Sequence, residues 1–173
     1  CGQVRTVFVS HPNLDHFSGL LDIVRFCEVG EVVVHDSFVA SAKRMPAVDA
    51  FLAGVAQRGV PVRTVSAGDS LRIGALDVRV MWPSRGFRTT RDNDFSLVLH
   101  ITHESGTSML MTGDIETEPA ATLLARIRSG AAADEAPMCV DVMELPHHGS
   151  WREAVAELVR EVGPTFLMQS TAR

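Results

Sequence analysis

The chain has 173 residues, of which 46% are apolar, and a formal net charge of −5. This length fits one domain with enough apolar side chains for a continuous core, so we expect a single domain over residues 1–173. No stretch approaches the roughly 20 uninterrupted apolar residues needed to cross a bilayer, which predicts a soluble piece without a transmembrane segment. The acidic balance is not the basic footprint of a duplex DNA-binding protein.

The first half of the chain alternates between strand and helix patterns. Apolar residues occur in continuous runs where strands are predicted and at helical spacing where helices are predicted, and glycines are expected to end the helices. In chain order, the predicted elements are a strand at 4–10, a helix at 20–27 stopped by Gly30, a strand at 31–35 and a helix at 47–55 closed by Gly59.

The second half begins with a change of period. Between Pro61 and Trp82 the apolar residues alternate, which predicts antiparallel strands with tight turns. The elements expected after that are a polar loop at 83–94, a hairpin of 95–102 and 109–112, a helix at 116–128, a Gly/Ala-rich connection at 130–136, a strand at 138–145, a helix at 151–162 and a strand at 165–168. Crossover helices together with hairpins imply an α/β (α+β) fold with a mixed sheet layered by helices.

The cysteines and the chain ends give few constraints. Cys1, Cys27 and Cys139 are odd in number and lack C-x-x-C spacing, so they imply neither a disulfide framework nor a thiolate zinc site. We expect Cys27 and Cys139 to be small buried hydrophobes. The chain begins without methionine and ends directly after an expected strand, so we expect a domain cut at both ends, with any targeting segment outside it.

Three short polar segments follow apolar runs at predicted strand ends. They are Ser10–His16, Thr112–Asp114 and Leu145–Ser150. A strand that ends in a short turn delivers its last side chains to one rim of a sheet, where distant segments can meet. Imidazole and carboxylate groups are ligands for divalent metals that activate water. The sequence therefore predicts a metal site built from all three segments.

Taken alone, each segment also fits an ordinary structural role. Those roles are turn residues for His11 and His16, and helix N-caps for Asp15, Asp114 and Ser150. The adjacent His147 and His148, directly after a predicted strand, are poorly explained by either role. Three such segments in one chain favour the metal site. The other histidines, His35, His100 and His103, are expected to be strand residues rather than ligands.

The motifs resemble those of the metallo-β-lactamase superfamily and, within it, most closely the ComEC-type competence proteins. The matching segments are HPNLDH at 11–16, DNDFSLVL at 92–99, TGD at 112–114 and PHHGS at 146–150. The resemblance covers most of the chain. It implies an αββα sandwich of mixed sheets with a metal site at their edge, and it implies that this chain lacks the first strands of that sandwich.

The resemblance also implies a role for each matched residue. The implied metal ligands are His11, Asp15, His16, Asp114 and His148, with Asp114 as the bridging carboxylate. His147 would lie behind the ligands or contact the substrate, although the sequence leaves open which of the two histidines binds metal. The implied cofactor is one or two divalent ions, zinc or manganese.

Two positions depart from the superfamily signature. Asn13 stands where the signature has its second histidine, and Asp92 or Asn93 stands where a middle histidine is expected. Both changes fall on the same one of the two usual metal positions. The implied site is therefore asymmetric, with one complete position and one that is weak or completed by substrate. We place Asn13, Asp92, Asn93 and Ser150 among the substrate-binding candidates.

The expected function is a metal-dependent hydrolase, with a phosphodiester as the favoured substrate. The resemblance suggests DNA, in particular a single strand. Asp15 and Asp114 would position the attacking water, and His147 or Ser150 would hold a phosphate oxygen or protonate the leaving group. Two alternatives stay open: a hydrolase of another ester, a lactone or a β-lactam, and a non-catalytic binding module with a decayed metal site.

The arginines near the predicted site have two possible roles. Arg85, Arg88 and Arg91 precede Asp92, and Arg152 follows the two histidines, so they form either a cationic rim near the metal or a solvated surface. The resemblance implies that a full-length parent could be membrane-bound, with this domain on its extracytoplasmic side.

Overall fold

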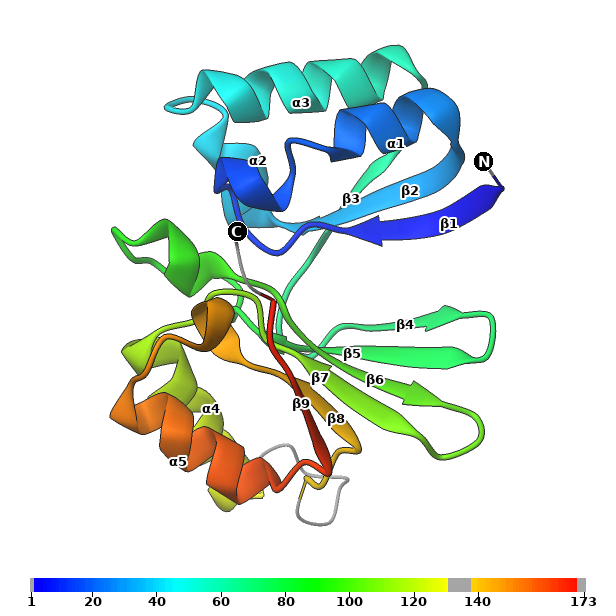
Figure 1. The fold of residues 1–173 in the computed structure, drawn as a ribbon. Helices are drawn as coiled ribbons and strands as arrows, with labels where there is room; N and C mark the ends of the chain where they lie inside the picture. Colours follow the sequence, from blue (N-terminus) through cyan, green and yellow to red (C-terminus); the bar gives the residue numbers. More distant parts are fainter. Residues whose placement is uncertain (1, 131–137, 171–173) are drawn as a thin grey trace.

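The computed structural model describes residues 2–130 and 138–170, which form two facing β-sheets with helices on both outer surfaces (Figure 1). This is the αββα arrangement that the sequence resemblance implied. The first half contains β1 (Gln3–Phe8), η1 (Leu14–His16), α1 (Leu20–Phe26), β2 (Glu28–His35), α2 (Asp36–Ser41), α3 (Pro46–Gln57) and β3 (Val62–Val65). The second half contains β4 (Ser70–Ile73), β5 (Leu76–Trp82), η2 (Asp92–Phe95), β6 (Val98–His103), β7 (Ser108–Met111), α4 (Thr117–Arg128), β8 (Val142–Glu144), η3 (Pro146–Gly149), α5 (Glu153–Val162) and β9 (Phe166–Met168).

The first sheet has the order β1-β2-β3, and its strands are parallel. Alternation along β2 divides its valines between two cores, as period two requires. Val32 and Val34 pack with Phe51 of α3, whereas Val33 packs with residues of the second sheet. This sheet is therefore covered by helices on one side and by the other sheet on the second side.

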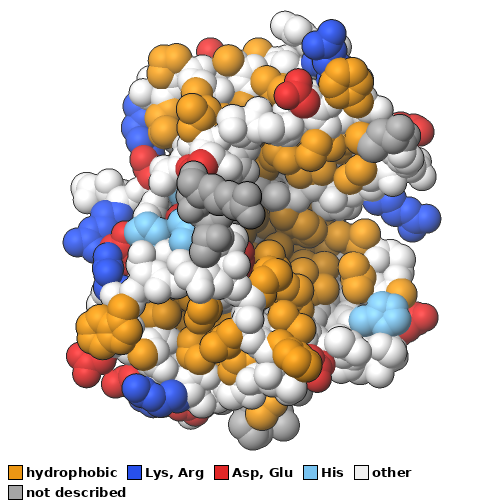
Figure 2. All heavy atoms as spheres, viewed as in Figure 1, with side chains coloured by type: hydrophobic (Ala, Val, Ile, Leu, Met, Phe, Trp, Pro, Cys, Tyr) orange, Lys and Arg blue, Asp and Glu red, His pale blue; other side chains and the backbone are white. Residues whose placement is uncertain are grey.

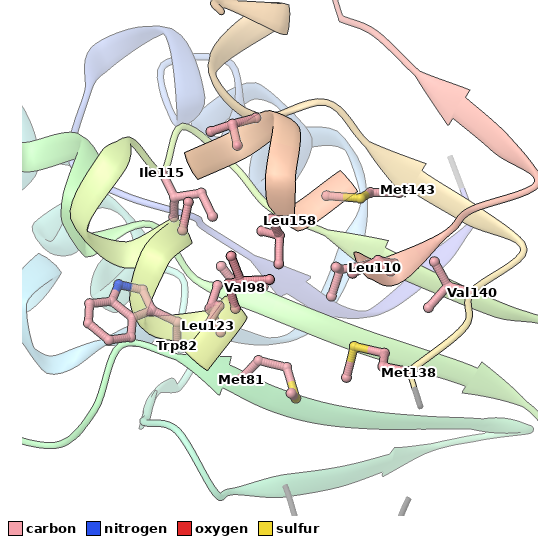
Figure 3. Packing of buried hydrophobic residues seen from close by; sticks show 14 residues of the cluster. Met81, Trp82, Val98, Leu110, Ile115, Leu123, Met138, Val140, Met143 and Leu158 are labelled. Carbon is pink, nitrogen blue, oxygen red and sulfur yellow. The ribbon is translucent and has the colours of Figure 1, made fainter. Parts of the chain in front are cut away.

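The second sheet has the order β4-β5-β6-β7-β8-β9, and it is mixed. The pairs from β4 to β7 are antiparallel, while β7, β8 and β9 are parallel. Its outer face packs against α4 and α5 through a buried cluster that includes Trp82, Leu123 and Leu158 (Figure 3). On the face seen in Figure 2, apolar side chains also lie between the two sheets.

Parallel pairing explains where the polar segments converge. β1 ends just before His11, and the neighbouring β7 and β8 end just before Thr112 and Pro146. The carboxyl ends of β7 and β8 lie at one edge of their sheet because the two strands are parallel. A backbone hydrogen bond from Leu97 to the carbonyl of Ser10 (2.9 Å) ties the end of β1 to this same edge.

Several local predictions are wrong for physical reasons. β3 pairs with β2 in parallel and not in an antiparallel hairpin. Gly30 does not stop a helix but lies inside β2, where a Cβ atom would come 2.4 Å from the Arg5 carbonyl oxygen, so only glycine permits this strand spacing. The predicted strand at 138–145 is shorter, and α2 was not predicted. Most of the expected connection at 130–136 lies outside the described residues.

The cysteine prediction is also wrong. Cys139 is free and exposed, and Cys27 is only half-buried. Within residues 2–130 and 138–170, no helix has the length and apolar character needed to span a membrane.

Candidate metal centre

Five side chains from three separate segments meet at the edge shared by the two sheets. They are His11, Asp15 and His16 after β1, Asp114 after β7 and His148 after β8. Potential ligand atoms of His11, His16 and Asp114 lie within 4.8 Å of one another, and so do those of Asp15, His16 and His148. His16 belongs to both groups, so the structure places these side chains in one continuous cluster.

Two imidazoles converge on the Asp114 carboxylate. His16 Nε2 lies 3.3 Å and His148 Nε2 lies 3.5 Å from the same oxygen, Oδ2 of Asp114. His16 Nε2 is also 3.5 Å from Oδ2 of Asp15. The ring centroids of His11 and His16 are 4.1 Å apart. One carboxylate oxygen thus lies among imidazole nitrogens, as a bridging ligand would.

Serine hydroxyl groups hold the histidine rings from behind. His11 Nδ1 lies 3.0 Å from the hydroxyl of Ser10 and 3.1 Å from that of Ser96, and His16 Nδ1 lies 3.2 Å from Ser10. The Ser96 hydroxyl also accepts the backbone N–H of Asp114 at 3.0 Å. When Nδ1 donates to a serine oxygen, Nε2 is left unprotonated and able to bind a cation.

The donor set fits a divalent cation. The Nε2 atom of His11 is buried and has no hydrogen-bond partner within the described part of the chain, while the buried Nε2 of His16 faces the Asp114 carboxylate. Buried polar atoms are normally satisfied, so an unsatisfied imidazole nitrogen beside a second imidazole and a carboxylate suits a cation as its partner. Imidazole nitrogen and carboxylate oxygen are suitable ligands for zinc or manganese.

The electrostatics of His11 and Asp114 agree with this fit. Burial, followed by the neighbouring His16, lowers the pKa of His11 to about 4, so this imidazole is neutral. The adjacent Asp114 raises the pKa of His16. Burial would raise the pKa of Asp114, but the hydrogen bond and charge of His16 outweigh it, and the net pKa is lowered. The cluster therefore pairs a neutral imidazole with an ionised carboxylate at neutral pH.

Backbone strain accompanies the two adjacent histidines. His147 (φ 49°, ψ 53°) and His148 (φ 56°, ψ 26°) both occupy the left-handed region, which costs a non-glycine residue about 1–3 kcal/mol. The turn is held by a hydrogen bond from the His147 backbone N–H to the Gly113 carbonyl (3.1 Å). The turn directs the two rings to different carboxylates: His148 Nε2 lies 3.5 Å from Asp114, and His147 Nδ1 lies 3.5 Å from Glu116.

Gly113 allows the close packing beneath the site. It has a φ of +54°, and a Cβ atom there would lie 2.9 Å from Cβ of Ser96 and 3.2 Å from Cβ of Ser10. The backbone N–H groups of Thr112 and Gly113 both donate to one oxygen of Glu144 at 3.0 Å. Sequence reasoning missed Glu144, because nothing in the linear pattern signals a contact between the ends of two neighbouring strands.

Glu116 is a second residue that sequence reasoning missed. One of its oxygens lies 3.5 Å from His147 Nδ1 and accepts a hydrogen bond from the Asn93 side chain at 3.3 Å. The other lies 3.6 Å from the guanidinium of Arg91 and 4.0 Å from that of Arg152. Glu116 lies two residues after the TGD segment, and this closeness to a predicted ligand was the only signal in the sequence.

The substrate-binding candidates have different hydrogen-bond partners. The Asn13 side chain donates to Asn93 at 2.8 Å, so these two lie together beside the cluster. Asp92 is held by Arg44, in an ion pair with both guanidinium nitrogens. Ser150 donates its backbone N–H to the His147 carbonyl at 2.9 Å. The residues at the replaced positions are therefore bonded to each other or to Arg44.

The alternative roles as helix caps are not what the structure shows. The N-cap residues of α1, α4 and α5 are Gly19, Glu116 and Arg152, and none of the three caps its helix through a side-chain hydrogen bond. Asp15 lies inside η1, and Asp114 precedes the N-cap of α4 by two residues. The side chains of Asp15, Asp114 and Ser150 therefore do not cap these helices.

The remaining histidines lie apart from the cluster, as expected. His35 is buried (1% exposed), accepts the Ser37 backbone N–H and stacks on Phe95. His100 is buried in β6, and His103 hydrogen-bonds to Ser105. None of the three belongs to the potential ligand groups of the described residues.

Comparisons with known proteins agree with this architecture. The family model described as "Beta-lactamase superfamily domain" matches residues 2–168. The chain is structurally similar to CmlA, a diiron β-hydroxylase from Streptomyces venezuelae (TM-score 0.60, 14% identity, 95% of this chain and 35% of that one). It is also similar to yeast PDE1 (TM-score 0.57, 15% identity, 81% and 43%) and to the metallo-beta-lactamase fold protein YhfI from Bacillus subtilis (0.52, 10%, 94% and 62%).

These identities are low, so the structural likeness establishes the fold alone. The chain spans only about a third of the length of CmlA and less than half that of yeast PDE1. No curated protein matches the sequence.

Proposed function

Because the chain belongs to the beta-lactamase superfamily, we propose that it is a metal-dependent hydrolase that cleaves phosphodiesters, with single-stranded DNA as its substrate, as in the ComEC-type branch. The observation that carries the proposal is the cluster itself: possible ligand atoms of His11, His16 and Asp114 lie within 4.8 Å of one another, and so do those of Asp15, His16 and His148.

The ligands would be His11, His16, Asp114, His148 and Asp15. A divalent cation held by them, zinc or manganese, would supply Lewis acidity toward a water molecule and toward the phosphoryl oxygens. One or two ions are compatible with the proposal, since His16 belongs to both groups of ligand atoms.

The chain's own residues account for positioning and proton movement. The Asp15 side chain is 68% exposed, whereas that of Asp114 is 7% exposed. Asp15 therefore faces the substrate side and would orient the attacking water. His147 Nδ1 lies 3.5 Å from Glu116, and its Nε2 would protonate the departing oxygen.

Arginine side chains support a phosphodiester over a neutral ester. Arg91 and Arg152 both approach Glu116 next to His147, so two positive charges meet one negative charge at the rim of the cluster. Figure 2 shows Lys and Arg side chains directly beside histidines on this face. Guanidinium groups match the geometry and charge of phosphate, which offsets locally the repulsion from a net charge of −5.

The test is hydrolysis of bis(4-nitrophenyl) phosphate and of a labelled single-stranded oligonucleotide, with added manganese or zinc and after chelation. We expect metal-dependent cleavage of both, and Asp114→Asn should lose at least 100-fold of the activity. Asp49→Asn, on an exposed position of α3, is the matched control and should keep full activity. Cleavage of a lactone, a β-lactam or a carboxylic ester without cleavage of either phosphodiester would contradict the proposal.

A further inference from the structure

A cavity of about 690 Å³ lies next to the metal centre, between α2 and the loop of residues 83–94. Figure 1 shows this loop beside α2 at the same end of the sheets. The volume falls within the roughly 300–1,000 Å³ typical of small-molecule sites. Its lining residues include Ser37 and Arg44 on the α2 side, and Phe87, Arg88 and Phe95 on the loop side. None of these residues belongs to the ligand cluster.

The aromatic part of the lining is fixed in place from behind. Phe95 stacks on the buried His35 with ring centroids 6.3 Å apart, and Phe87 packs edge-on against Trp82 at 4.5 Å. The two phenyl rings also contact each other at 5.8 Å, with an interplanar angle of 77°. Because its neighbours restrain each ring, the cavity offers an aromatic surface that needs little ordering when a planar ligand binds.

The cationic part is not neutralised in the same way. Arg44 is paired with Asp92, but the exposed Arg88 makes its hydrogen bond to the backbone carbonyl of Phe87 at 3.0 Å. The carboxylate of Asp36 also lines the cavity, but it lies 3.1 Å from Nδ1 of His35, and none of the described carboxylates forms an ion pair with Arg88. Its guanidinium is therefore available to a negative charge on a ligand that also contacts the rings.

The cavity and the metal centre share one chain segment. Phe95 lines the cavity, and the next residue, Ser96, contacts His11 and Asp114 through its hydroxyl. Arg44 lines the cavity and holds Asp92, the first residue of the same η2 turn. A substrate that occupied both places would run along residues 92–96.

We propose that this cavity binds a nucleotide that flanks the scissile phosphate, with its base against Phe87 and Phe95 and its phosphate on Arg88. The inference rests on the proposed phosphodiesterase function and adds to it a subsite that binds one nucleotide of the substrate. Planar bases stack on aromatic rings whatever their sequence, and arginine supplies the matching charge. The nucleotide site explains why an aromatic surface and an unpaired guanidinium line one cavity beside a hydrolytic centre.

The experiment is a calorimetric titration of the full chain with adenosine 5′-monophosphate, both as purified and after chelation. We expect Arg88→Gln to weaken binding at least tenfold. Arg85→Gln is the matched control, since Arg85 is exposed on the same loop but does not line the cavity, and its affinity should stay within twofold of the original. Adenosine and inorganic phosphate, which each carry half of the ligand's chemistry, should bind at least tenfold more weakly.

A second readout follows the cavity directly. The chain has two tryptophans, so Trp151→Phe leaves Trp82, which contacts Phe87, as the sole indole. Its emission should change with the same binding curve. Equal losses in the Arg88→Gln and Arg85→Gln variants would overturn the proposal, and so would phosphate binding as tight as that of the nucleotide.

The two proposals fail in distinguishable ways. If no phosphodiester is cleaved but nucleotide binding depends on Arg88, the proposed function fails and the cavity assignment stands. If bis(4-nitrophenyl) phosphate is cleaved but the Arg88→Gln variant binds the nucleotide with unchanged affinity, the function stands and the cavity assignment fails.

Discussion

The side-chain amide of Asn13 donates a hydrogen bond to the side-chain oxygen of Asn93 across 2.8 Å. These are two of the positions where the superfamily signature leads one to expect histidines. The contact ties the segment after β1 to the η2 turn, and Asn93 continues it to Glu116. The amide pair thus joins, by a direct hydrogen bond, two segments in which the sequence departs from the superfamily signature.

A double-mutant cycle measures this contact. Asn13→Ala and Asn93→Ala should each lower the free energy of unfolding, and their effects should be non-additive by about 1 kcal/mol, the usual net value of a hydrogen bond. Metal content should be unchanged in both variants, because neither residue belongs to the ligand groups. Chemical denaturation and elemental analysis provide the two measurements. Additive effects, or loss of metal from either variant, would show that the pair has another role.

The paired histidines should differ in metal binding. His148→Ala should lose at least tenfold in metal affinity because it removes a nitrogen 3.5 Å from the Asp114 carboxylate. His147→Ala should keep the metal and lose turnover, since His147 contacts Glu116. Competition with a fluorescent chelator measures affinity, and His103→Ala, whose ring bonds to Ser105 away from the cluster, is the control. Equal affinities of the two variants would refute this division of roles.

Gly113→Ala should damage the metal centre by steric contact. The added Cβ would come 2.9 Å from Ser96, whose hydroxyl contacts both His11 and Asp114. We expect a loss of about 1–3 kcal/mol in unfolding free energy together with weaker metal binding. Gly59→Ala, with a similar φ of +68° but open space around its Cβ, separates backbone strain from the clash. It should cost less and leave metal affinity intact.

His35 should contribute to the pH dependence of stability. Burial lowers its pKa below the ordinary value of 6.5, so the folded protein keeps this imidazole neutral. The unfolded chain therefore takes up a proton first as the pH falls below about 6.5, and stability present above that pH is lost on acidification. In chelated protein, His35→Asn, which retains an acceptor for the Ser37 N–H, should show a shallower loss between pH 7 and pH 5 in urea unfolding. Parallel profiles would count against this contribution.

The elements with a clear period were predictable from the sequence. α3, α4 and the hairpin of β6 and β7 lie close to their expected positions, because an amphipathic stripe or an alternating strand carries its own signal. β3 was predicted with the wrong pairing, since alternation gives the faces of a strand but not the direction of its neighbour. α2 has only six residues, too few to show a helical period.

The ligand segments were predictable for a related reason, because each lies directly after an apolar strand. The structure brings together His11, Asp15, His16, Asp114 and His148, all of which were named from their motifs. The supporting residues were not. Glu144, Glu116 and Ser96 act through contacts between segments far apart in the chain, and no local pattern distinguishes them from other polar residues.

The imidazoles of His11 and His16 follow a strand of the first sheet, whereas Asp114 and His148 follow strands of the second. An ion bound by these groups would cross-link the two sheets. Its binding energy would oppose their separation, and the melting temperature would rise with free ion concentration. Conversely, loosening of the valine-rich layer between the sheets would weaken ion capture without touching any ligand.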